Sequence, residues 1–74
     1  MAPEARHKYE MHIYWSADDS VYVAEVPDLP GCMAHGDTPA EAAANAEDAI
    51  TLWIDTAREF GDPIPEPRRH QAFA

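Results

Sequence analysis

Few side chains in this 74-residue sequence are of types that do chemistry, and the histidines come first. A metal site needs two or three histidines that converge with a carboxylate. The sequence holds four, at His7, His12, His35 and His70. His12 and His35 would meet only if their strands were neighbours with matching faces. We therefore interpret the histidines as solvated or strand-surface residues and predict no metal site.

Cysteine and aspartate supply the other reactive candidates. Cys32 and His35 form a conceivable nucleophile and base pair, but no neighbouring cation lowers the pKa of Cys32. A small apolar packing role is the better interpretation of Cys32. Asp18 and Asp19 belong to a turn, where adjacent side chains diverge. Because the sequence also lacks a phosphate-binding glycine pattern and a nucleophile elbow, it predicts no enzymatic activity and no cofactor.

The distribution of charge is a stronger signal. The chain carries 14 acidic and 5 basic residues, a net charge of −9 at pH 7. Between Tyr9 and Pro67 there are 13 acids and one base, Arg58, so this body has a net charge of −12. Nucleic acids and anionic membrane surfaces would repel it, whereas a basic protein would be attracted. The alternative is that the acidity only keeps a small domain soluble.

Length and composition favour one small cytoplasmic domain. Its predicted extent is residues 8–67, with tails at 1–7 and 68–74, and a hydrophobic content of 46% argues against disorder. One cysteine excludes an internal disulfide and fits a reducing compartment. No stretch approaches the roughly 20 apolar residues that span a bilayer, and no apolar run typical of a signal peptide is visible.

Alternating apolar residues predict a β-hairpin near the N-terminus. Period-two patterns cover residues 8–15 and 20–26, and the polar residues 16–19 between them form the turn. A four-residue turn places the apolar sets of both strands on one face. The predicted cross-strand pairs are Trp15 with Ser20, Ile13 with Tyr22, and Met11 with Ala24. A rigid proline-rich turn then leads to a short third strand at 32–36.

The second face of this hairpin is too apolar for open water. A face of this kind is a candidate contact between subunits. The predicted oligomer contacts are His12, Tyr14, Val21 and Val23.

The strongest local signal is a capped amphipathic helix. Thr38 as N-cap, a proline at the first helical position and Glu41 at the third predict a helix over Pro39–Phe60, which Gly61 ends. Leu52 falls within the acidic face and should be exposed. The predicted apolar face consists of Ala42, Ala43, Ala46, Ala49, Ile50, Trp53, Ile54, Ala57 and Phe60. The opposite face carries Glu41, Asp48, Asp55 and Glu59.

Two runs of the sequence are specific in combination. Val21–Cys32 reads VYVAEVPDLPGC, and His35–Ala42 reads HGDTPAEA. The apolar pairs of the helix and the segment Pro63–Pro67 continue the pattern, which spans about residues 9–67. Over this length the sequence resembles the HicB-like antitoxins of type II toxin–antitoxin systems.

The resemblance adds to the predicted fold. From the residues, the fold class is α+β, a three-stranded antiparallel sheet packed on one long helix. The resemblance implies a short C-terminal fourth strand in a βββαβ, partial ribonuclease H-like order, and residues 68–74 either form it or fray. No aspartate set here matches the metal-binding carboxylates of ribonuclease H, so nuclease activity is not expected.

The resemblance also implies partners. Members of the family form dimers or higher oligomers, here a dimer or tetramer. Their cognate HicA toxins are small basic RNA-cleaving proteins, and the antitoxin covers the toxin's active site and RNA surface. Because the sequence ends at Ala74, we expect a short form without a DNA-binding domain and no direct binding of nucleic acid by this chain alone.

The predicted function is therefore neutralisation of a HicA-like toxin. The predicted contacts with it are Asp28, Leu29, Gly31, Glu41, Asp48, Leu52, Asp55 and Glu59. Without the resemblance, an ordinary solvated helix face explains the acidic residues equally well. The alternative function is an orphan structural module that self-associates and has no toxin partner.

Overall fold

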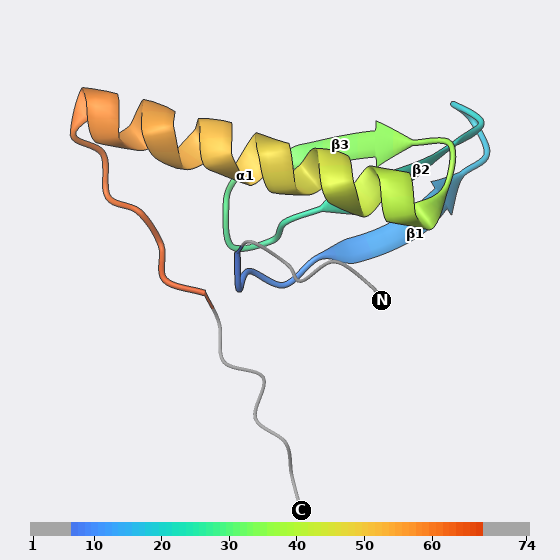
Figure 1. Cartoon of the computed structure of the whole chain (residues 1–74), viewed down its shortest axis with the longest axis horizontal. Helices are drawn as coiled ribbons and strands as arrows, with labels where there is room; N and C mark the ends of the chain where they lie inside the picture. Colours follow the sequence, from blue (N-terminus) through green and yellow to red (C-terminus); the bar gives the residue numbers. More distant parts are fainter. Residues whose placement is uncertain (1–6, 68–74) are drawn as a thin grey trace, which may run out of the picture.

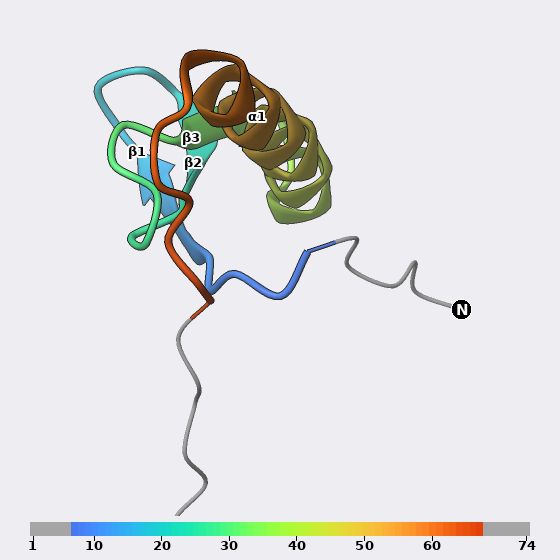
Figure 2. The ribbon, with the colours of Figure 1, turned by 90° about the vertical axis from the view of Figure 1, so that its left-hand side faces the viewer.

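Residues 7–67, which the computed structural model describes, form a three-stranded antiparallel sheet with one long helix on one of its faces (Figure 1). Strands β1 (His12–Ser16), β2 (Val21–Glu25) and β3 (Met33–Gly36) are neighbours in chain order, and helix α1 covers Pro39–Phe60. Figure 2 shows the two layers from the end of the helix, with the sheet beside α1. The structure confirms the predicted α+β class.

The register of the β1–β2 hairpin differs from the prediction by two residues. Trp15 lies opposite Tyr22 instead of Ser20. The turn covers residues 17–20, one position later than predicted, and Ser20 takes a positive φ of 55°. The rings of Trp15 and Tyr22 meet edge to face with centroids 5.1 Å apart, a favourable contact that the predicted register lacks. Because side chains alternate with period two, the shift leaves each one on its predicted face.

The turn between β2 and β3 is closed by backbone hydrogen bonds. The Leu29 N–H donates to the Val26 carbonyl at 3.1 Å, and the Cys32 N–H donates to the Leu29 carbonyl at 2.9 Å. Gly31 has a φ of 78°, a conformation that favours glycine. The turn therefore covers the side chain of Leu29. Leu29 packs in a first core cluster with Val26, Cys32 and Ile50.

Both ends of α1 follow the predicted capping chemistry. The Thr38 hydroxyl oxygen accepts a hydrogen bond of 3.0 Å from the Glu41 N–H, and Pro39 occupies the first turn. Gly61 closes the helix in a left-handed conformation with a φ of 70°. These local contacts explain why the observed bounds equal the predicted ones. Within the described residues, no helix is long and apolar enough to cross a bilayer.

The first half of α1 lies very close to the sheet. Ala24 on β2 meets Ala42 and Ala46 in a second core cluster, and all three are fully buried. A Cβ atom on Gly36 would lie only 2.6 Å from the Ala42 backbone nitrogen. Small side chains on both layers are therefore a requirement of this packing.

The second half of α1 extends past the ends of the strands (Figure 1). Ala57 is buried there, and Trp53 and Ile54 are half-buried against the first core cluster. Phe60, which the prediction placed on the apolar face of the helix, is 71% exposed. Among residues 7–67, no strand lies beneath the last turn to cover an aromatic ring.

The segments before β1 and after α1 cross the same side of the molecule. The Tyr9 hydroxyl donates to the Pro65 carbonyl, and Nδ1 of His7 lies 2.7 Å from the Glu47 carboxylate. Glu47 is buried, which the sequence did not predict. Strand β1 begins at His12, whereas the prediction began the first strand at residue 8. Residues 62–67 form neither helix nor strand. The fourth strand predicted at 68–74 lies outside the described residues.

Candidate partner-binding surface

Four carboxylates line the exposed side of α1, and we call them the acidic stripe: Glu41, Asp48, Asp55 and Glu59. Spacings of seven and four residues keep side chains on one side of a helix with 3.6 residues per turn. Leu52 lies among them and is 68% exposed, as predicted. The structure thus brings five of the predicted partner contacts onto one helix face.

The predicted contacts in the β2–β3 turn do not all reach the surface. Gly31 is exposed and Asp28 is half-buried. Leu29 is fully buried, so its side chain cannot contact a partner, and that prediction is wrong. The leucine fills the space beneath the turn because the backbone bonds direct it into the core.

The reactive candidates stay apart. His12 lies on β1 and His35 on β3, at opposite edges of the sheet with β2 between them. His12 Nε2 lies 3.4 Å from the Glu10 carboxylate at an exposed position. Asp19 accepts a hydrogen bond of 3.3 Å from the Ser16 hydroxyl in the turn. Among residues 7–67, no three His, Cys, Asp or Glu side chains are placed to hold a metal ion.

Cys32 is a free, buried thiol in the first core cluster. Burial raises the pKa of the Cys32 thiol above its ordinary value. A raised pKa keeps the sulfur protonated at neutral pH, whereas a nucleophilic cysteine needs the thiolate. The position of Cys32 therefore fits packing and does not fit nucleophilic chemistry.

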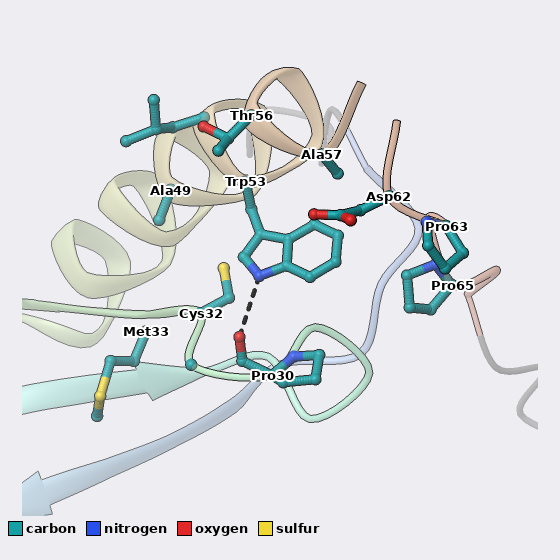
Figure 3. A pocket seen from close by; sticks show the side chains of 12 residues that line it. Pro30, Cys32, Met33, Ala49, Trp53, Thr56, Ala57, Asp62, Pro63 and Pro65 are labelled. Atoms are coloured by element: carbon teal, nitrogen blue, oxygen red, sulfur yellow. Dashed lines mark hydrogen bonds between the residues drawn. The ribbon is translucent and has the colours of Figure 1, made fainter. Parts of the chain in front are cut away.

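A groove of about 700 Å³ lies beneath the second half of α1, and we call it the α1 groove (Figure 3). Its walls are α1, the segment 30–33 and the segment 62–65. The side chains that line it are mainly apolar, and Asp62 supplies a carboxylate. The α1 groove could not be predicted from the sequence, because its walls come from three segments that are far apart in the chain.

The indole ring of Trp53 forms part of the wall of the α1 groove. Its indole N–H donates to the Pro30 carbonyl at 3.0 Å, which fixes the ring between the helix and the turn (Figure 3). Leu52 and Met33 also line the groove and are 68% and 51% exposed. The prediction placed Trp53 on the apolar face of the helix and not at a surface groove. An exposed leucine directly before it was the available signal of a surface site.

The open face of the sheet holds the predicted oligomer contacts. Tyr14 is 44% exposed, His12 is exposed and Val21 is half-buried. Val23 is only 7% exposed, because it lies in the central strand between Tyr14 and His35 on the two neighbouring strands. Val23 therefore offers almost no surface to a second subunit, and the prediction for this residue is wrong.

Comparison with known proteins bears on this surface. A family model described as the HicB-like antitoxin of a bacterial toxin–antitoxin system matches residues 9–73. A 14.9 kDa protein from the rep–hol intergenic region of Haemophilus phage HP1 is 44% identical over 45 residues, which are 61% of this chain and 34% of that protein. A UPF0150 protein of Thermoplasma acidophilum is 40% identical over 48 residues, 65% of this chain and 70% of that protein.

A UPF0150 protein of Synechocystis is 35% identical over 57 residues, which are 77% of each chain. The chain thus spans about a third of the phage relative and most of the other two. No solved structure matches this chain. The family match extends over nearly all of the 74 residues, and with it the chain belongs to the HicB-like antitoxin family.

Proposed function

We propose that this protein is an antitoxin that binds and neutralises a small basic RNA-cleaving toxin of the HicA type. The observation that carries the proposal is the family match over residues 9–73. The acidic stripe supports a basic partner, because complementary charge speeds encounter and orients the complex. The exposed leucine within the stripe, Leu52, supplies apolar area at the centre of the same face.

The proposed mode of action is occlusion. The acidic stripe with Leu52, together with Asp28 and Gly31 of the β2–β3 turn, contacts the toxin and covers its active site and RNA surface. Carboxylates compete there with RNA phosphates for the same basic side chains. The protein needs no catalytic group, metal or cofactor for this task. Its place is the cytoplasm, where the buried free thiol of Cys32 remains reduced.

Growth rescue tests the antitoxin role directly. The neighbouring genes are first searched for a short open reading frame that encodes a small basic protein. That protein is then expressed in a bacterial host, with or without the full chain. We expect the toxin alone to stop growth, and co-expression to restore it with recovery of a stable complex. Absence of both rescue and complex would overturn the proposal.

Charge variants test the proposed surface. Asp55→Asn with Glu59→Gln removes two carboxylates of the acidic stripe, and Asp18→Asn with Asp19→Asn removes two exposed ones from the β1–β2 turn. Both pairs change the net charge equally. We expect the stripe pair to slow association with the toxin about tenfold at low salt, and the turn pair to change it little. Equal effects would show that only total charge matters.

A second candidate, self-association without a toxin, rests on the open sheet face. Tyr14 is 44% exposed there, and a hollow of about 590 Å³ lies over β2 and β3 beside Val21. Light scattering would show a dimer or tetramer, and Val21→Glu would convert it to a monomer. If the oligomer survives this change, the open face is not the contact. An oligomer that also binds the toxin would combine both functions.

A further inference from the structure

The α1 groove combines an aromatic face with a carboxylate. Figure 3 shows the Asp62 carboxylate directed toward the indole ring of Trp53, with Pro63 and Pro65 behind it. Asp62 is held in place because its backbone N–H donates to the Ala57 carbonyl at 2.8 Å in the cap of the helix. Trp53 is held in place by its own bond to Pro30. The Trp53 ring is therefore fixed on the groove wall, and the backbone that carries the Asp62 carboxylate is fixed beside it.

The charge at this end of α1 favours a cation. A helix C-terminus carries partial negative charge, and Asp62 adds a full one just beyond it. Arg58 lies in the last turn of the helix, but among the described residues no cationic side chain pairs with the Asp62 carboxylate. Asp55 and Glu59 of the acidic stripe lie on the same half of the helix and add negative charge there.

We propose that the α1 groove binds an arginine side chain of the basic partner. The guanidinium would lie over the Trp53 ring and pair with Asp62, while its aliphatic stem packs on Leu52 and Met33. Arginine fits better than lysine, because its planar head stacks on aromatic faces and pairs with carboxylates through two donors. This inference rests on the proposed function for the identity of the partner, whereas the arginine site itself rests on the groove.

The chain has two tryptophans. The experiment uses the full chain with Trp15→Phe, which leaves Trp53 as its single indole. The probe is the blocked peptide Gly-Ser-Gly-Arg-Gly-Ser-Gly, with counterparts that carry lysine, citrulline or leucine at the centre. Binding is followed by the NMR signal of the Trp53 indole N–H. We expect the arginine peptide to shift this signal, the lysine peptide to bind several-fold more weakly, and the uncharged peptides not to bind.

The matched variants are Asp62→Asn and Asp18→Asn, which change the net charge equally. Asp18 lies in the β1–β2 turn, at the opposite end of the molecule from the C-terminus of α1 (Figure 1). We expect Asp62→Asn to weaken binding of the arginine peptide about fivefold, the size of one surface ion pair, and Asp18→Asn to leave it unchanged. Equal effects of the two variants, or equal binding of the citrulline or leucine peptide, would overturn the inference.

A further background, Arg68→Ser with Arg69→Ser, tests these two arginines of the chain itself as the occupant. If the peptide binds only in this background, one of these two arginines occupies the groove in the unchanged protein. That result would overturn the proposal that an arginine of the partner occupies it. The peptide experiment contains no toxin. Its failure would therefore overturn the arginine site and leave the antitoxin role standing. Failure of growth rescue would overturn the antitoxin role and the identity of the partner, and would leave the arginine site standing.

Discussion

The first half of α1 lies against β2 and β3 through alanines, whereas the second half extends past the sheet and carries tryptophan, leucine and phenylalanine (Figure 1). In the first half, Ala42 and Ala46 are fully buried. In the second half, Leu52 and Phe60 are 68% and 71% exposed. One amphipathic pattern therefore serves two purposes along a single helix.

The comparison separates residues that hold the fold from residues that form a surface. Alanine against alanine gives close layers and leaves no room for a ligand. Trp53 bridges the second half of the helix and the β2–β3 turn through its bond to Pro30, and the α1 groove lies between these segments. The proposed arginine site thus belongs to the half of α1 that packs less closely.

The largest expected effect compares a buried residue and an exposed residue that lie close together on α1. Ile50→Ala should lower the free energy of unfolding by about 3 kcal/mol, because Ile50 is fully buried in the first core cluster and leaves a cavity. Leu52→Ala, two residues away and exposed, should change it by less than about 0.5 kcal/mol. Urea unfolding measures both. Similar losses would erase the distinction between core and surface on this helix.

Overpacking of the first half should have the next largest effect. Ala46→Leu inserts three carbon atoms between α1 and Ala24 and should destabilise the fold by about 2 kcal/mol. Ala44→Leu, the same change on an exposed side of the helix, is the control and should be nearly neutral. Thermal unfolding of the two variants decides the point. A stable Ala46→Leu protein would mean that the close layers can separate at little cost.

Removal of the helix cap is expected to cost less. Thr38→Ala leaves the Glu41 N–H without its side-chain acceptor and should lower the free energy of unfolding by about 1 kcal/mol. Thr56→Ala, in the second half and exposed, should have an effect below about 0.5 kcal/mol. Chemical denaturation compares them. An unchanged Thr38→Ala variant would show that packing alone fixes the start of the helix.

The smallest effect concerns pH at the floor of the α1 groove. Burial raises the pKa of Cys32 above its ordinary value of 9.0, so the unfolded chain loses this thiol proton at lower pH than the native protein. The stabilisation is complete below the unfolded pKa and declines as pH rises toward the native one. Above pH 9, wild-type stability should fall more steeply than that of Cys32→Ala. Parallel slopes would mean that water reaches the thiol through the groove.

Local chemistry explains what could be predicted of the fold. The bounds of α1 follow from Thr38, Glu41 and Gly61, which act within a few residues of one another. The strand faces follow from a period of two. The hairpin register was wrong by two residues, because either register keeps the same faces inward and the contact between Trp15 and Tyr22 decides between them.

The candidate surface was predictable in part for the same reason. The acidic stripe and exposed Leu52 could be read from helical spacing. Leu29 and Val23 were misplaced, because the fold of a turn and the cover from neighbouring strands determine their burial. No spacing indicated that Asp62 and Trp53 would face one groove with Pro30.

The sequence by itself determined the class of fold, the helix and its caps, the acidic character of the body and the family resemblance. These features depend on periodicity, on composition or on contacts between residues close in the chain. Only the tertiary structure decided the register, the burial of Leu29, Val23 and Glu47, and the α1 groove. Each of these depends on how segments distant in sequence approach one another, and their separation is set by the packing of the helix on the sheet and the turn.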